Sequence, residues 1–237
     1  MNKYLIPLLF GISLAACSQA DLRMAQEVLQ SAGGGAALSD RDIAAGLREA
    51  LATGTERAVT RIGKPDGFWN APALRIPLPE SLAKAEKLMR SLGQSKTVDD
   101  FHLSLNRAAE KAVPEAAAVF AGAIREMTLA DARQILQGPD NAATTYFQGK
   151  TTGILTARFK PIVTRATAAA GATRKYKDLT AKVGRLVPGF APTDLDAYVT
   201  ERALAGVFTT LAEEEKQIRV NPAARTSELL KKVFGGR

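Results

Sequence analysis

The feature that most constrains the fold of this 237-residue chain is a helix-start pattern that occurs four times after residue 38. In each copy a serine or threonine is followed three residues later by an aspartate. The hydroxyl can accept a hydrogen bond from an unpaired N–H of the first helical turn, and the carboxylate lies at the positive end of the helix dipole. The pairs are Ser39/Asp42, Thr97/Asp100, Thr128/Asp131 and Thr193/Asp196, and Asn221-Pro222 is a fifth start signal of another kind. Starts this frequent predict a chain built from helices.

The spacing of apolar residues supports the same interpretation. Apolar side chains recur every three or four residues after several of these starts, as expected for helices with one buried face. No stretch of the sequence alternates as a half-buried strand would. The clearest faces are Ile43, Leu47, Leu51, Ala58, Val59 and Ile62; Leu195, Tyr198, Val199, Ala203, Val207 and Leu211; and Leu229, Leu230, Val233 and Phe234. The sequence therefore predicts an all-α fold, a single multi-helix bundle over residues 38–237.

One segment of the chain cannot be helical. Residues 64–67, Lys-Pro-Asp-Gly, are typical of a turn, and the prolines between 72 and 79 push the residues before them out of the helical conformation. We therefore expect a proline-rich extended loop. Phe68 and Trp69 give this loop apolar bulk, which must pack either on the helices or on a partner. Packing on the helices is the simpler expectation.

The N-terminus has the three parts of a bacterial signal peptide, and we assign it to residues 1–16. Residues 1–3 carry a positive charge, residues 4–14 are apolar, and Ala15 and Ala16 are the small residues that a signal peptidase requires. The apolar part is too short to cross about 30 Å of hydrocarbon as a stable anchor.

The last four residues of this region, Leu14-Ala15-Ala16-Cys17, resemble the lipobox of bacterial lipoproteins. There the thiol is alkylated with a diacylglyceryl group before the signal is removed. Cys17 is the only cysteine, so no disulfide can form within the chain, and we expect it to be the lipidated first residue of the mature protein. Residues 17–37, with three glycines at 33–35, are expected to form a flexible tether.

The resemblance to lipoproteins also implies a location. Ser18 after the cysteine implies sorting to the outer membrane, with the mature domain facing the periplasm. The chain carries a formal charge of +8, which attracts anionic polymers and lipid headgroups. The expected partners are therefore the membrane through Cys17 and an envelope protein or an anionic envelope polymer. Nucleic acid is not expected for an exported protein.

Several phrases together resemble an uncharacterised family of bacterial lipoproteins, the domain of unknown function 4197. They are Arg75-Ile76-Pro77-Leu78-Pro79, Asn106-Arg107-Ala108-Ala109-Glu110-Lys111, Ala143-Thr144-Thr145-Tyr146-Phe147 and the segment from Pro222 to Gly235. The similarity extends over roughly residues 38–235. It implies an exported helical protein and carries no established activity.

The residue types that common active sites need are scarce. His102 is the only histidine, so neither a zinc site nor a histidine-based di-iron site can be assembled from the usual ligands. We expect His102 to be a partly exposed residue in the first turn of a helix. A serine-nucleophile elbow and a phosphate-binding loop are also missing from the sequence. We therefore predict no catalytic residue, no metal ligand and no cofactor.

The most distinctive polar cluster is Asn106, Arg107 and Glu110, which lies among apolar residues. Arg107 and Glu110 are three residues apart and can pair on one helix face. If that face is turned inward, the pair would line a cleft together with Thr145 and Tyr146. If it is turned outward, the pair is a surface ion pair with little effect on stability. The run Glu213-Glu214-Glu215-Lys216 is expected to form a solvated face.

Three hypotheses about function follow. The first is a non-enzymatic binding or scaffold module of the cell envelope. The second is a hydrolase of envelope polymers that works through paired carboxylates, with Glu110 and either Asp131 or Glu126 as candidates. The third is a carrier that holds a small apolar ligand, such as a fatty acid or a quinone, between its alanine-rich helices.

Overall fold

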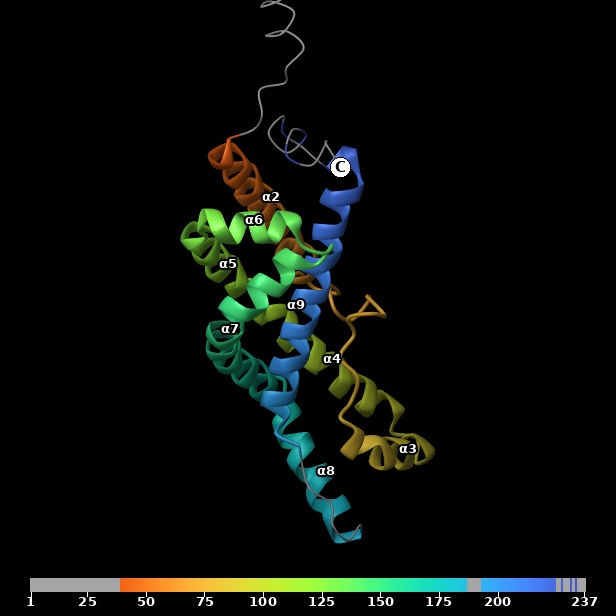
Figure 1. Ribbon diagram of the computed structural model, residues 1–237. Coiled ribbons are helices and arrows are strands. Elements are labelled where there is room, and N and C mark those ends of the chain that lie inside the picture. The colour runs from red at the N-terminus through yellow and green to blue at the C-terminus, as the bar shows by residue number, and fades with distance from the viewer. Residues whose placement is uncertain (1–38, 187–192, 225–226, 228–230, 232, 234–237) are drawn as a thin grey trace, which may run out of the picture. The chain divides into compact units, whose positions relative to one another are not determined.

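The computed structural model of the protein describes residues 39–186 and 193–224, together with Ser227, Lys231 and Val233. The predicted signal peptide, Cys17, the tether and most of the last helix (229–234) lie outside the described residues. Within the described ranges every regular element is a helix, which confirms the all-α prediction (Figure 1).

Most helices from α3 to α8 follow one another with short connections, whereas residues 63–79 separate α2 from η1. Their bounds are α2 (Asp40–Ile62), α3 (Ala83–Ser91), α4 (Ser95–Ala112), α5 (Glu115–Glu126), α6 (Leu129–Gln137), α7 (Ala142–Ala169), α8 (Ala172–Leu186) and α9 (Leu195–Val220). Two single 3-10 turns, η1 (Glu80–Leu82) and η2 (Pro222–Ala224), precede α3 and follow α9.

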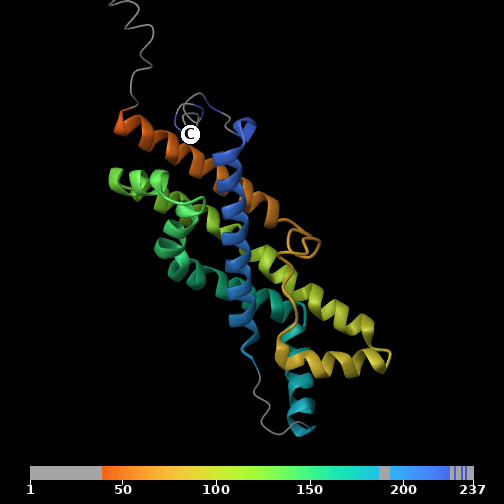
Figure 2. The ribbon, with the colours of Figure 1, turned by 45° about the vertical axis from the view of Figure 1, so that its right-hand side comes forward.

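Helix α9 lies at the centre of the packing. It contacts α2, α4 and α7, and the ribbon views show it crossing these helices (Figures 1 and 2). Helix α5 packs on α2 and α7, and α6 packs on α2. Helices α3 and α8 are more peripheral, because α3 contacts mainly α4 and η1, whereas α8 contacts α4 and α7.

The core combines phenylalanine rings with many alanines. Phe120 lies between two other rings, with centroid distances of 5.1 Å to Phe147 and 6.2 Å to Phe208. Fully buried alanines such as Ala58 and Ala203 let neighbouring helices approach closely. The apolar faces predicted for α2 and α9 are buried, except that Ile43, Val59 and Tyr198 are only half-buried.

Two of the predicted helix starts are confirmed. Ser39 and Thr128 each form a capping box, in which the hydroxyl accepts from the N–H of the aspartate three residues later and that carboxylate accepts from the cap N–H. At the second box, the hydrogen bonds from the backbone N–H and the hydroxyl of Thr128 lower the pKa of Asp131.

Two other starts need correction. Helix α4 begins at Ser95, with Gln94 before it, so Thr97 lies inside the helix and does not cap it. Helix α9 begins one residue later than predicted, because the side chain of Asp194 accepts from the N–H groups of Asp196 and Ala197. A carboxylate at the cap position competes well with a neighbouring hydroxyl. Asn221 does act as a cap, since its side chain accepts from the N–H of Ala223 in the 3-10 turn η2, whose first residue is Pro222.

The proline-rich loop is present as predicted. Residues 64–74 form a series of turns, and residues 75–79 have no regular structure. Phe68 is fully buried and lies against Gly206 of α9, where an added Cβ would come within 2.5 Å of the ring. The loop therefore packs on the helices, and a glycine on α9 makes room for its aromatic side chain.

Candidate functional site

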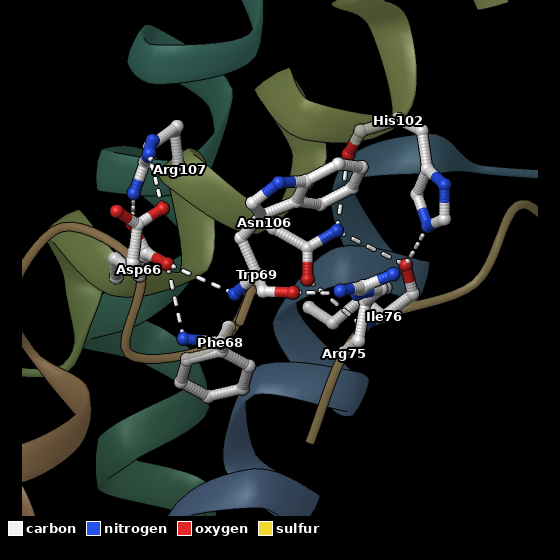
Figure 3. Close-up of polar contacts among 9 residues, drawn as sticks. Asp66, Phe68, Trp69, Arg75, Ile76, His102, Asn106 and Arg107 are labelled. Carbon is white, nitrogen blue, oxygen red and sulfur yellow. Dashed lines mark hydrogen bonds and ion pairs between the residues drawn. The ribbon is translucent and has the colours of Figure 1, made fainter. Parts of the chain in front are cut away.

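The polar cluster of α4 faces the proline-rich loop. The Oε1 atom of Glu110 accepts hydrogen bonds from the N–H groups of Phe68 (3.0 Å) and Trp69 (3.2 Å). Arg107 donates to Oε2 of Glu110 (2.7 Å) and to Asp66 (2.7 Å), so the guanidinium joins the buried carboxylate to the start of the loop (Figure 3). Both hydrogen bonds raise the pKa of Arg107, with the one to Glu110 contributing more.

Asn106 anchors the other end of the same loop. Its side chain is fully buried, accepts from the N–H of Ile76 (2.8 Å) and donates to the C=O of Ile76 (3.1 Å). Asn106 thereby replaces the backbone partner that Ile76 would have in a sheet. The guanidinium carbon of Arg75 lies 4.6 Å from the ring centroid of Trp69. The Nε atom of Arg75 donates to the backbone C=O of Trp69 (Figure 3).

His102 differs from its predicted place. It lies beyond the first turn of α4, because the helix begins earlier than the sequence indicated. Its Nε2 atom is 2.6 Å from the C=O of Ile76, and its ring meets Trp69 edge-on at 5.0 Å. His102 therefore helps to hold the loop and is only partly exposed.

Thr145 and Tyr146 make their hydrogen bonds elsewhere. Thr145 is exposed on α7 and donates to the C=O of Asn141 within its own helix. Tyr146 donates to the C=O of Ala123 on α5, and burial raises the pKa of its hydroxyl. The structure thus brings Asn106, Arg107 and Glu110 together with the loop, and the hydrogen bonds of Thr145 and Tyr146 do not join that group.

A second buried carboxylate was not expected from the sequence. Glu215 of α9 is buried, which contradicts the prediction that the whole run 213–216 is a solvated face. Its oxygens accept from the N–H groups of Ala143 and Thr144 and from the Thr144 hydroxyl, each at 2.9 Å. Arg219 pairs with it at 3.0 Å and also donates to the C=O of Ile135 (2.8 Å).

This second arrangement has a clear local cause. Helix α7 has no side-chain cap of its own, since Asn141 does not form one. A carboxylate from α9 therefore satisfies the first N–H groups of α7, at the positive end of its dipole. The i, i+4 spacing of Glu215 and Arg219 was the available signal. Glu213 and Glu214 both pair with Arg61 of α2.

An apolar groove lies between α3, α4 and α8. It has a volume of about 450 Å³ and is lined mainly by aliphatic and aromatic side chains. Leu88 of α3 and Leu92, directly after α3, form one wall and are 53% and 68% exposed, whereas Val98 and Phe101 of α4 are buried. Tyr176 of α8 stacks on Phe101 with 6.4 Å between ring centroids. The size and the apolar lining of this groove suit an apolar ligand.

A second hollow lies between α7 and α9. Its volume is about 460 Å³, and threonines and charged residues make up much of its lining, among them Thr152, Thr156, Lys160 and Glu201. The hydroxyls of Thr152 and Thr156 donate to carbonyl groups of their own helix. Those donors are therefore already used within α7.

Two further properties concern the described part of the chain only. Its histidine and acidic side chains form no group of three or more that could hold a metal ion. None of its helices combines the length and the apolar character needed to cross a bilayer.

Comparison with known proteins assigns the chain to a family. No curated protein and no solved structure matches it. The model of one family does match, over residues 37–235, and its description is "Protein of unknown function (DUF4197)". Since this match covers most of the chain and agrees with the resemblance seen in the sequence, the protein belongs to the DUF4197 family.

Proposed function

We propose that this protein is a lipid-anchored component of the cell envelope that binds an apolar ligand in the groove between α3, α4 and α8 and catalyses no reaction. The observation that carries the proposal is the groove itself, with its volume of about 450 Å³ and its two exposed leucines. Binding pockets for small molecules typically measure about 300–1,000 Å³ and are mostly apolar.

The positions of the buried carboxylates support binding rather than acid/base chemistry. Glu110 and Glu215 are engaged by backbone N–H groups and by an arginine each, so their oxygens are used to hold the fold. Asp131 is engaged in the capping box of α6. A general acid or base must reach the substrate directly or through one water molecule. The carboxylate hydrolase is therefore the weaker hypothesis.

The anchor is the second part of the proposal. The lipobox ending at Cys17 supports attachment of acyl chains, and Ser18 supports sorting to the outer membrane, with the domain on the periplasmic side. Two or more acyl chains hold a protein on a bilayer almost permanently. Such an anchor would keep the groove close to a supply of apolar molecules.

The anchor can be tested in cells that produce the full-length chain. Radiolabelled palmitate should enter the protein, and the Cys17→Ser variant should lose both the label and its fractionation with outer membranes. A Ser18→Asp variant serves as the sorting control, since it should keep the label and move to the inner membrane. Wild-type protein that takes up no label would refute the anchor.

A scaffold that recruits an envelope protein or an anionic polymer is the second candidate. The excess of basic residues favours it, since the chain has 32 Lys and Arg against 24 Asp and Glu. Pull-down from solubilised envelopes at low salt should then recover a stoichiometric partner that is released as the salt concentration rises. Recovery of the protein alone at every salt concentration would count against this candidate.

A further inference from the structure

The groove has a floor, a wall and a rim of different character. Its floor is formed by buried apolar residues, including Val98 and Phe101 of α4. Its wall is α3 and the residue after it, where Leu88 and Leu92 are four residues apart and are each more than half exposed. Exposed aliphatic side chains beside an apolar hollow are a feature of ligand-binding grooves and of surfaces that bind proteins or membranes.

The volume of the groove indicates the size of a ligand that it could hold. At about 450 Å³ it lies in the lower half of the range of small-molecule pockets, about 300–1,000 Å³. A volume of this size suits one acyl chain better than the two chains of a bilayer phospholipid.

The rim of the groove carries charges of both signs. Lys175 and Asp178 line it from α8, three residues apart, and neither forms an ion pair within the described part of the chain. Glu86 lines it from α3 and is paired with Arg90 at 2.9 Å. A cation and an anion at the mouth of an apolar groove complement a headgroup that has one charge of each sign.

We propose that the groove binds a single-chain zwitterionic phospholipid, with the acyl chain along Leu88, Leu92 and Phe101 and the headgroup at the rim. The phosphate would lie near Lys175 and the ammonium group near Asp178. This inference rests on the proposed function, because it identifies the class of ligand for the same groove.

The first test identifies the occupant in cells with the full-length chain. A photoreactive benzoylphenylalanine is placed at position 92, and at position 154 as a control, because Leu92 and Ile154 are both exposed but only Leu92 lines the groove. Mass spectrometry after irradiation should find an adduct of a single-chain phospholipid at position 92 and none at position 154.

Each other outcome of this test contradicts the proposal. A protein adduct at position 92 would identify the groove as a protein-docking surface. Adducts of two-chain phospholipids would mean that α3 touches the bilayer surface. Equal labelling at both positions, or none, would mean that the groove holds no lipid. The anchor is read separately, since palmitate labelling of Cys17 and the adduct at position 92 can each fail alone.

The second test measures binding of a fluorescent lysophosphatidylethanolamine with a 16-carbon chain to the purified full-length protein. The double variant Leu88→Ser/Leu92→Ser should bind about tenfold more weakly. The matched double variant is Ile154→Ser/Val220→Ser. These two side chains are 52% and 56% exposed and do not line the groove, so this variant should bind like wild type. Equal losses in the two variants would overturn the proposal.

The headgroup is tested by reversing single charges on α8. Lys175→Glu should weaken binding of the same probe about threefold, whereas Arg174→Glu, which does not line the groove, should leave binding unchanged. Unlabelled lysophosphatidylethanolamine should displace the probe at lower concentration than palmitate does, since palmitate has no cation for Asp178. Equal displacement by the two lipids would overturn the assignment of the headgroup.

Discussion

Glu110 and Glu215 are two buried carboxylates that hold distant segments of the chain in different surroundings. Each accepts from two consecutive backbone N–H groups and pairs with an arginine on its own helix. Glu110 holds a loop, and its partner Arg107 is 33% exposed. Glu215 holds the start of a helix, and its partner Arg219 is only 6% exposed.

The difference in exposure predicts a difference in energy. A charge left without its partner costs little where water can reach it and much where water cannot. Arg107 can turn toward solvent and keeps Asp66 if Glu110 is lost. Arg219 lies in the interior, although it keeps the C=O of Ile135. The site at Glu215 should therefore be the more costly one to break.

The largest effect is expected for Glu215→Ala. The substitution leaves the N–H groups of Ala143 and Thr144 and the guanidinium of Arg219 without their carboxylate, and it should lower the free energy of unfolding by about 3–5 kcal/mol. Urea denaturation followed by circular dichroism measures this change. Glu213→Ala is the control, since its exposed pair with Arg61 is worth less than about 1 kcal/mol.

The next effect is expected for Glu110→Ala, at about 2–3 kcal/mol, because two N–H groups of the loop lose their acceptor while Arg107 stays partly hydrated. Trp69 is the only tryptophan and reports the change directly. Its fluorescence should shift to longer wavelength in folded Glu110→Ala and stay unchanged in folded Glu215→Ala. The same shift in both variants would mean that the two sites are coupled.

The third prediction concerns the packing of the Phe68 ring on α9, as distinct from the hydrogen bonds between Glu110 and the backbone of the loop. Gly206→Ala places a methyl group within 2.5 Å of the Phe68 ring, and this overpacking should cost about 1–3 kcal/mol. Gly149→Ala on α7 is the matched control, since nothing lies within 4 Å of the added Cβ. The control should leave stability unchanged or raise it by up to about 1 kcal/mol in thermal denaturation.

The same comparison explains which features the sequence could predict. The capping boxes at Ser39 and Thr128 join residues three positions apart, so a local pattern was sufficient to find them. The carboxylates act over far greater separations, 42 residues from Glu110 to Phe68 and 72 from Glu215 to Ala143. The i, i+4 spacing to Arg219 marks Glu215 as able to form an ion pair, but only the packing of α9 on α7 determines that this carboxylate is buried.

The same difference between local patterns and long-range contacts applies to the candidate cluster and to the groove. The sequence placed Asn106, Arg107 and Glu110 on one helix correctly, because they lie within five consecutive positions of α4. It could not identify their partners, which come from the proline-rich loop and not from α7. An alanine-rich composition suggested a pocket between helices, but its position depends on how α3 and α8 meet α4, which the sequence does not encode locally.

The smallest effect on the free energy of unfolding is expected for Asp66→Asn. Asp66 lies at the exposed end of the hydrogen-bond network that holds the loop. Asp66 adopts a positive φ of 71°, which asparagine tolerates as well, so the backbone should be unaffected. The substitution removes an exposed ion pair with Arg107 and should cost less than about 1 kcal/mol at low salt. This cost should vanish in about 1 M salt, where the Debye length falls to about 3 Å. The cost of Glu215→Ala should persist in the same salt, because its pair is shielded from the solvent. If the two variants respond equally to salt in urea denaturation, exposure is not what distinguishes the two carboxylate sites.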